Sequence, residues 1–141
     1  MLVILIGNIG TGKSTFAKNI SKGREVIDYD NLGEKHGQNF NVYNEILKLL
    51  KKGKTVIVDG VNIEKRKRKD LIYFARINNA KSVAIDFGKG NEKSLHNRIS
   101  QPRNIPIEVW KREHYHNIKI YEKPCKSEGF DRVIRCKNYY E

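Results

Sequence analysis

The first twenty residues, MLVILIGNIGTGKSTFAKNI, place a short apolar run directly before a glycine-rich segment. Residues 2–6 are all aliphatic, and such a run is typical of a buried strand. Gly7, Gly10 and Gly12 follow, so the backbone there can approach a ligand closely. A helical pattern comes next, and a helix N-terminus attracts anions. The chain therefore begins with a strand, a phosphate-binding turn and a helix, which predicts an α/β fold.

Residues 7–14, GNIGTGKS, match the pattern GxxxxGK[ST] of the P-loop. In such a loop successive amides point at phosphate oxygens, Lys13 reaches the β- and γ-phosphates, and the Ser14 hydroxyl binds Mg²⁺. An ordinary glycine-rich turn would not need the lysine and the serine, so we expect ATP and Mg²⁺ as cofactors. The predicted nucleotide-binding residues are Gly7, Asn8, Ile9, Gly10, Thr11, Gly12, Lys13, Ser14 and Thr15.

Strand-like and helix-like segments alternate along the rest of the chain. The expected strands are 2–6, 25–28, 55–60, 82–87 and 131–136. The expected helices are 13–22, 42–53, 64–78, 92–100 and 106–120. This alternation predicts one domain, 1–141, with a parallel sheet covered by helices on both faces. Ligands of such sheets bind beyond the carboxyl ends of the strands, where we expect Gly7, Asp30, Asp59 and Gly88 to meet.

The charge of the chain is strongly unbalanced, with 28 Lys and Arg against 16 Asp and Glu and a net charge of +12. Such an excess on a small domain favours polyanionic partners, with DNA or RNA first among them. A general basic character that only aids solubility is the alternative. The sequence leaves the oligomeric state open.

Other features of the composition bear on location. No apolar run is long enough to span a membrane, and no basic segment precedes residues 2–6 as in a signal peptide. Cys125 and Cys136 form no CxxC pattern. We therefore expect a cytoplasmic protein with reduced cysteines and no membrane partner. His114 and His116 fall on different sides of a predicted helix, which disfavours a zinc site.

Two acidic positions near strand ends are candidates for chemistry. Asp30 lies just past the strand 25–28, where a carboxylate near the γ-phosphate can accept the proton of a hydroxyl. A turn-capping role for Asp30 is equally open, and Asp28 is the weaker candidate for the base. Asp59 ends the strand VIVD, and we expect it to help hold Mg²⁺, directly or through water, together with Ser14.

Two groups of basic residues are candidates for binding phosphates. Arg98 and Arg103 flank a hinge interrupted by proline, and guanidinium groups on such a segment can close over phosphates as a small lid. A solvated surface is the alternative for both. Residues 65–69, KRKRK, can dock a phosphodiester backbone or simply begin a helix, although cations at a helix start oppose its dipole.

The order of these pieces resembles the polynucleotide 5′-kinase branch of the P-loop kinases over nearly the whole chain. The resemblance rests on the segments GNIGTGKST, DYDNLG, VIVDGVNIEKRKR, NRISQPRNIPIEVWKREHY and EKPCKSEGFDRVI. It implies five parallel strands in the order 2-3-1-4-5, Asp30 as the general base, and Arg98 and Arg103 as lid arginines. It also implies that Asp59 and Asn62 replace the family's Asp-Thr-Asn turn and that CKSEGF lies near the adenine.

One position departs from this family. The family usually has an arginine three residues after the base, where it holds the acceptor's own phosphate, but this chain has Gly33. Lys35 or a residue of the 65–69 run could substitute. The leading hypothesis is an ATP- and Mg²⁺-dependent kinase of a 5′-hydroxyl end of DNA or RNA. The alternatives are a P-loop kinase of a hydroxymethylated base in DNA, a nucleoside or another small molecule, and a nucleic-acid-binding protein switched by nucleotide.

Overall fold

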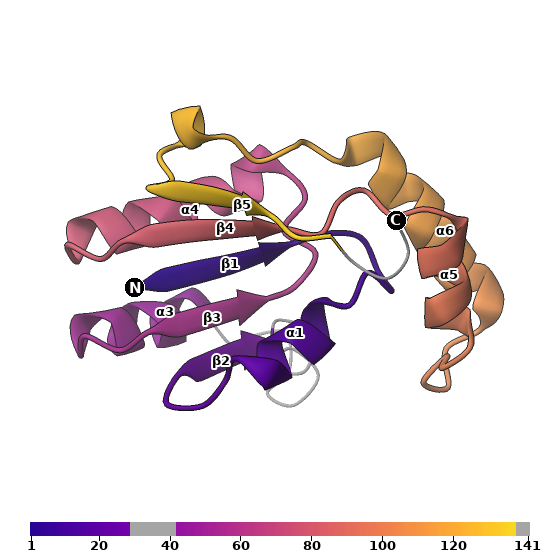
Figure 1. Ribbon diagram of the computed structural model, residues 1–141, viewed down its shortest axis with the longest axis horizontal. Coiled ribbons are helices and arrows are strands. Elements are labelled where there is room, and N and C mark those ends of the chain that lie inside the picture. Colours follow the sequence, from indigo (N-terminus) through magenta and orange to yellow (C-terminus); the bar gives the residue numbers. More distant parts are fainter. Residues whose placement is uncertain (29–41, 138–141) are drawn as a thin grey trace.

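A five-stranded sheet forms the centre of the computed structural model, which describes residues 1–28 and 42–137. The strand order is β2-β3-β1-β4-β5, and each neighbouring pair is parallel (Figure 1). The strands are β1 (Leu2–Ile6), β2 (Glu25–Asp28), β3 (Val56–Asp59), β4 (Ser82–Asp86) and β5 (Arg132–Arg135). Aliphatic side chains, most of them β-branched, dominate β1, β3 and β4, which favours buried strands. The fold class and strand order expected from the sequence are confirmed.

The helices follow the predicted pattern closely. They are α1 (Lys13–Asn19), α3 (Val42–Lys51), α4 (Lys65–Ile77), α5 (Glu92–Ile99), α6 (Ile107–Ile120) and the short 3₁₀ helix η1 (Lys126–Glu128). α1 ends earlier than expected, and a turn with Gly23 at φ +74° leads into β2. Within residues 1–28 and 42–137, no helix is both long and apolar enough to cross a membrane.

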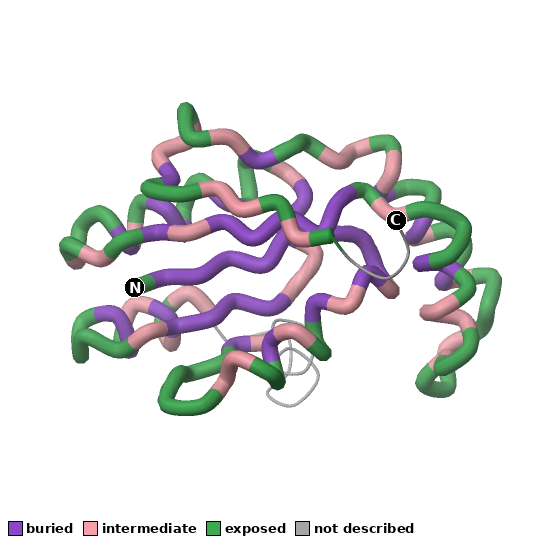
Figure 2. The backbone as a smooth tube through the Cα atoms, viewed as in Figure 1, coloured by how far each residue is buried: buried purple, intermediate pink, exposed green. Residues whose placement is uncertain are grey.

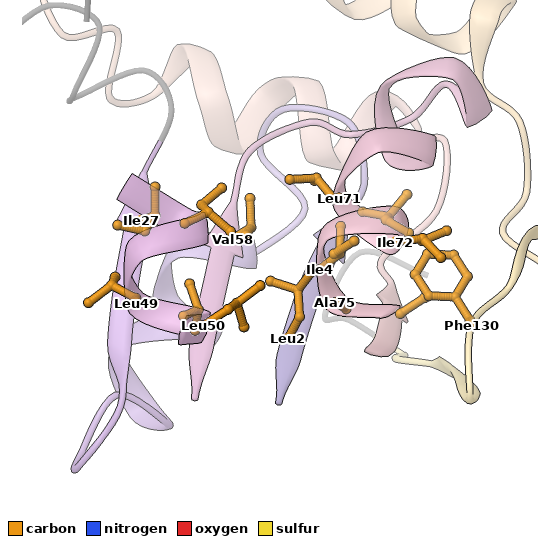
Figure 3. Close-up of a cluster of buried hydrophobic side chains, with 14 of the residues drawn as sticks. Leu2, Ile4, Ile27, Leu49, Leu50, Val58, Leu71, Ile72, Ala75 and Phe130 are labelled. Atoms are coloured by element: carbon orange, nitrogen blue, oxygen red, sulfur yellow. The ribbon is translucent and has the colours of Figure 1, made fainter. Parts of the chain in front are cut away.

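The core lies on both faces of β1, because alternate side chains of a strand point to opposite faces. On one face Leu2, Ile4 and Ile6 belong to a cluster with side chains of α3 and α4, part of which is drawn in Figure 3. On the other face Val3 and Leu5 pack with α1. Figure 2 shows the central strands buried along most of their length. Each buried aliphatic side chain contributes about 1.5–3 kcal/mol, so the sheet is a firm base for the loops at its carboxyl edge.

The turns that follow β1, β3 and β4 meet at this carboxyl edge. The Gly7 amide donates to Val61 O at 3.0 Å, and the Asn8 amide donates to Gly88 O at 3.1 Å. These two bonds join the glycine-rich turn to the turns after β3 and β4. α5 and α6 lie beyond the same edge (Figure 1).

Candidate nucleotide-binding site

The glycines of the P-loop supply the backbone conformations that its turn requires. Gly10 has φ +72° and Gly12 has φ +94°, values that other residues rarely adopt. A Cβ on Gly10 would lie 2.0 Å from the carbonyl oxygen of Ser94 in α5, so loop and helix meet at a distance that only glycine permits. The Asn97 side chain of α5 also donates to Gly10 O at 3.0 Å. The P-loop is therefore fixed against α5.

Lys13 lies over the P-loop at the start of α1. Its Nζ donates to the carbonyl oxygen of Asn8 at 2.7 Å, and the Thr11 hydroxyl donates to the same oxygen at 2.7 Å. Only 8% of Lys13 is exposed. The ammonium group is thus held beside the backbone amides of the loop, where the β- and γ-phosphates of a nucleotide would meet it.

Ser14 and Asp59 form the candidate Mg²⁺ site. Ser14 Oγ donates to Asp59 Oδ2 at 2.8 Å, so a hydroxyl from α1 contacts a carboxylate from the end of β3. Mg²⁺ prefers oxygen ligands and usually takes one or two carboxylates together with phosphates and water. The pair fits this ion. Asp28 lies next to Asp59 in the register of β2 and β3 and lines the same cleft.

A cleft of about 620 Å³ lies between the P-loop and the segment that contains α5 and α6. Lys13 and Ser14 of α1 and Asp59 of β3 line it, and so do Arg98 of α5 and Arg103 of the turn between α5 and α6. The two predicted lid arginines therefore share one cleft with the residues predicted to bind phosphate and metal. This arrangement puts positive charge on both sides of a phosphate chain.

Arg98 and Arg103 reach the cleft in different ways. The Arg98 guanidinium lies 5.0 Å from the centre of the Trp110 ring and donates to Gln101 O. Burial and the charge of Arg103 lower the pKa of Arg98. Arg103 and Asn104 have φ +52° and +60° in the turn between α5 and α6. Such values cost free energy in residues other than glycine, and strained turns of this kind are frequent at functional sites.

The structure refines the predicted lid. α5 is fixed to the P-loop at Gly10, and α6 is fixed to it by hydrogen bonds of Asn8 with His114 and Asn117. The two helices therefore form a wall of the cleft. The turn between them, residues 100–106, supplies Arg103 to the cleft, and its closure over phosphates stays a prediction.

The residues of the basic run 65–69 differ in their exposure. Arg68 is fully buried, and its Nε and Nη2 donate to the Glu128 carboxylate at 2.9 Å each. Its Nη1 donates to Asn62 O at 3.0 Å. Arg68 therefore joins α4 to η1, and the idea that the whole run docks nucleic acid is wrong for this residue. The exposed members of the run are Lys65, Arg66, Lys67 and Lys69.

Two expectations that came from the resemblance concern the segment CKSEGF and Asn62. CKSEGF, residues 125–130, precedes β5 and packs on α4, whereas the P-loop follows β1 at the other end of the parallel strands. No residue of this segment lines the described cleft. Asn62 is buried, and its Nδ2 donates to Leu5 O at 3.0 Å, so it supports the turn after β3. The predicted residues outside the described part of the chain are Asp30, Gly33 and Lys35.

Beside the P-loop, the ends of β4 and β5 carry a cluster that the sequence did not indicate. The Tyr121 hydroxyl donates to Asp86 Oδ2 at 2.7 Å, and Arg135 Nη1 donates to Asp86 O at 2.9 Å. Burial and the neighbouring carboxylate raise the pKa of Tyr121. A Cβ on Gly88 would lie 2.8 Å from the Arg135 guanidinium, so glycine lets this group reach the turn after β4. The partners are 35 and 49 positions apart, and no short motif reveals them.

Comparison with known proteins agrees with this geometry. A family model described as an AAA domain matches residues 2–116, which is most of the chain. The match spans the P-loop, Asp59, both cleft arginines and most of α6.

Several solved structures, two of them of kinases, are similar to the chain. A fungal RNA kinase has a TM-score of 0.75 and 20% identity, covering 99% of this chain and 75% of that one. Kti12 from Chaetomium thermophilum, solved with ADP-AlF3, has a TM-score of 0.66 and 16% identity, covering 97% and 89%. A gluconokinase from Sinorhizobium meliloti 1021 has a TM-score of 0.63 and 17% identity, covering 99% and 83%. These likenesses show that the chain has the same fold as these proteins.

Proposed function

The chain belongs to the AAA domain family, and we propose that it is an ATP-dependent kinase of polynucleotide ends. It transfers the γ-phosphate of ATP to the 5′-hydroxyl of DNA or RNA. The observation that carries this proposal is the shared cleft, in which Lys13, Ser14 and Asp59 face Arg98 and Arg103. A nucleotide-binding loop alone would need no second set of cations on the opposite wall.

Each part of the cleft has a chemical role in this proposal. The P-loop amides and Lys13 bind the β- and γ-phosphates, and Arg98 and Arg103 neutralise charge on the transferring phosphoryl group. Ser14 and Asp59 hold Mg²⁺, which when bound reduces the charge between the β- and γ-phosphates. Asp30, which follows β2, accepts the proton of the attacking hydroxyl.

The charge of the chain supports a polynucleotide as acceptor. The net charge is +12, and the exposed cations at the start of α4 directly follow the turn after β3. Val61 of that turn lines the cleft. A strand whose 5′ end lies in the cleft can therefore continue across these cations, which bind phosphates without regard to sequence. One of the similar solved proteins is an RNA kinase.

A small molecule is the second candidate acceptor. Gly33 stands where the resemblance leads one to expect an arginine on the acceptor's phosphate, and one similar structure is a gluconokinase. A guanidinium group would orient a phosphate through two parallel hydrogen bonds, and glycine offers only a backbone amide. A polynucleotide compensates by contacts farther along the strand, whereas a small molecule without a phosphate needs no such arginine.

An acceptor panel tests the proposal. The full chain is incubated with Mg²⁺, γ-labelled ATP and one of five acceptors: a 5′-hydroxyl DNA oligomer, the RNA equivalent, a nucleoside 3′-monophosphate, a duplex with hydroxymethylated bases, or gluconate. We expect rapid transfer to an oligomer and poor transfer to the monophosphate, because only longer strands reach the basic surface. The Lys13→Ala variant controls for contaminating kinases.

Other outcomes would contradict the proposal in distinct ways. Equal use of the monophosphate and the oligomer would mean that another residue replaces the missing arginine locally. Transfer only to the modified duplex or to gluconate would move the acceptor to the second class. ATP binding without transfer to any acceptor would favour a nucleotide-switched binding protein.

A further inference from the structure

Asn8, the second residue of the P-loop, is fully buried, and its side-chain amide is bonded at both ends. Nδ2 donates to Lys89 O at 2.8 Å and to His114 O at 3.1 Å. Oδ1 accepts from the Ile9 amide at 2.8 Å and from Asn117 Nδ2 at 3.0 Å. Backbone carbonyls face the nitrogen and a backbone amide faces the oxygen. The orientation of the Asn8 amide is therefore fixed.

The His114 imidazole lies beside this amide. His114 is fully buried, and its Nδ1 is 3.3 Å from Asn8 Nδ2. Asn8 Nδ2 is a donor group, so a proton on His114 Nδ1 would set a donor against a donor, and this places the single ring proton of the neutral imidazole on Nε2. Nε2 has no hydrogen-bond partner among the described residues. A second ring proton would set a donor against a donor, so the contact with Asn8 requires a neutral imidazole.

The surroundings of His114 also disfavour its charged form. Burial lowers the pKa of His114 from its usual 6.5, and the Glu92 carboxylate on α5 only partly opposes this. The Tyr115 ring lies 5.0 Å from the imidazole, and its hydroxyl donates to Glu92. On the P-loop side the ammonium group of Lys13 donates to the main-chain carbonyl of Asn8, the residue that contacts His114.

The sign of the pH effect follows from this lowered pKa. The unfolded chain binds the His114 proton more tightly than the folded chain does. The stability that neutral His114 contributes is therefore fully present at a pH above the pKa of His114 in the unfolded chain. It is lost as the pH falls through the lower pKa of His114 in the folded chain.

Asn8 connects α6 to the catalytic lysine. Its side chain is held by His114 and Asn117, and its main-chain carbonyl accepts from Lys13 Nζ. Neither His114 nor Asn117 lines the described cleft. Their hydrogen bonds to Asn8 connect them to Lys13, which does line it.

The same helix also forms the opposite wall of the cleft. Val109, Trp110 and Glu113 of α6 line the cleft, and His114 and Asn117 follow within two turns. α6 thus forms part of one wall of the cleft and is also hydrogen-bonded, through Asn8, to the P-loop in the other wall. The distance between Lys13 and the α6 wall depends on the bonds of Asn8.

We propose that His114 and Asn117 are positioning residues, which hold Asn8 so that Lys13 keeps its place opposite α6. Protonation of His114 breaks this hold and weakens nucleotide binding. The inference rests on the proposed function only in that the cleft binds ATP, and the identity of the acceptor does not enter it.

Asn117→Ala tests the hold directly, because it removes a donor to Asn8 without altering the cleft lining. We expect the Kd for ATP, measured by calorimetry at about pH 8, to rise about 3- to 10-fold, the effect of one buried hydrogen bond. Tyr115→Phe is the matched control on α6, since it removes only the exposed bond to Glu92 and should bind ATP like the wild type. An unchanged Kd in folded Asn117→Ala would overturn the proposal.

His114→Asn tests the proton independently. An asparagine Oδ1 can accept from Asn8 as Nδ1 does, but it does not titrate. The measurement is the ratio of the ATP Kd at about pH 5.5 to that at about pH 8, because the titration of ATP itself is common to both proteins. We expect this ratio to be larger for the wild type, by less than about 10-fold, because the lowered pKa of His114 leaves part of the imidazole neutral at pH 5.5.

Two results would contradict the role of the proton. Equal ratios in the wild type and His114→Asn would overturn it. A lower melting temperature in both variants with unchanged ATP binding would assign His114 and Asn117 to stability alone. These measurements report ATP binding and contain no acceptor, whereas the acceptor panel reports phosphoryl transfer. Failure of the proposed link between α6 and Lys13 can therefore be distinguished from failure of the proposed kinase activity.

Discussion

The two walls of the cleft are built in different ways. The P-loop wall is one continuous stretch, residues 7–15, in which neighbouring residues determine the turn, the charge and the helix start. The opposite wall consists of α5, α6 and the turn between them, and contacts between distant residues bring it into place. α5 reaches the P-loop through Asn97, and α6 reaches it through Asn117.

The two walls therefore differ in the interactions that they can make with a nucleotide. The P-loop wall meets phosphates already present in the ground state, so its residues bind the nucleotide and assist transfer alike. In the proposed reaction, Arg103 of the turn 100–106 would meet the phosphates from the other wall, where charge develops during transfer. Substitutions on the first wall should therefore lower affinity and turnover together, and those in the turn should lower turnover more.

Lys13→Ala gives the largest expected effect. Its ammonium neutralises phosphate charge in both the ground state and the transition state, so turnover should fall on the order of 10³-fold or more and ATP affinity should fall with it. Calorimetric titration with ATP and single-turnover kinetics measure the two quantities. Normal affinity and turnover in this variant would remove the P-loop assignment.

Asp30→Asn should cost at least about 10²-fold in turnover, the usual scale for loss of a general base, with ATP affinity nearly intact. The matched control is Asp28→Asn, because Asp28 ends β2 and lines the cleft. A larger loss in the Asp28 variant than in the Asp30 variant would transfer the role of base to Asp28. Near-normal turnover in Asp30→Asn would show that Asp30 is not the base and would favour a turn-capping role for this residue.

Arg103→Ala tests the turn between α5 and α6. We expect a loss of about 10- to 100-fold in turnover and a change in ATP affinity below about 3-fold, because the guanidinium acts on charge that develops late. Arg112→Ala is the control, since Arg112 is an exposed arginine of α6 outside the described cleft lining. If Arg103→Ala only raises the ATP requirement, Arg103 is a clamp for the bound nucleotide and the contrast between the walls disappears.

The sequence predicted the fold because its strongest signals are local. The apolar run 2–6, the glycines after it and the alternation of strands and helices each occupy a few consecutive residues. The strand order came from the resemblance and is confirmed. The position of CKSEGF near the adenine also came from the resemblance, and the segment precedes β5 and does not line the described cleft.

Contacts between distant residues could not be predicted in the same way. His114 and Asn117 are 106 and 109 positions from Asn8, and nothing near them in the sequence marks them as partners of the P-loop. The run 65–69 shows the same limit at a finer scale. All five residues of the run are basic, yet only Arg68 is buried. It is paired with Glu128, which is 60 positions away in the sequence, so no local pattern could reveal the difference.

The smallest expected effect concerns the path of the nucleic acid. Changing Lys65, Arg66 and Lys67 together to glutamine should flatten the slope of log affinity against log salt for a 5′-hydroxyl oligomer. Each lost phosphate contact removes about 0.7 from this slope for a single strand, so the upper limit is a change of about 2. Fluorescence anisotropy of a labelled oligomer at several salt concentrations gives the slope.

The observed change should lie below that limit. Glu64 lies 2.9 Å from Arg66 and 4.0 Å from Lys67, so part of their charge is already neutralised within the protein. The matched control changes Lys51, Lys52 and Lys54, which are also exposed but lie at and just after the end of α3, at the amino end of the sheet. It removes the same net charge far from the P-loop edge. If both triple variants flatten the slope equally, overall charge and not the start of α4 attracts the strand.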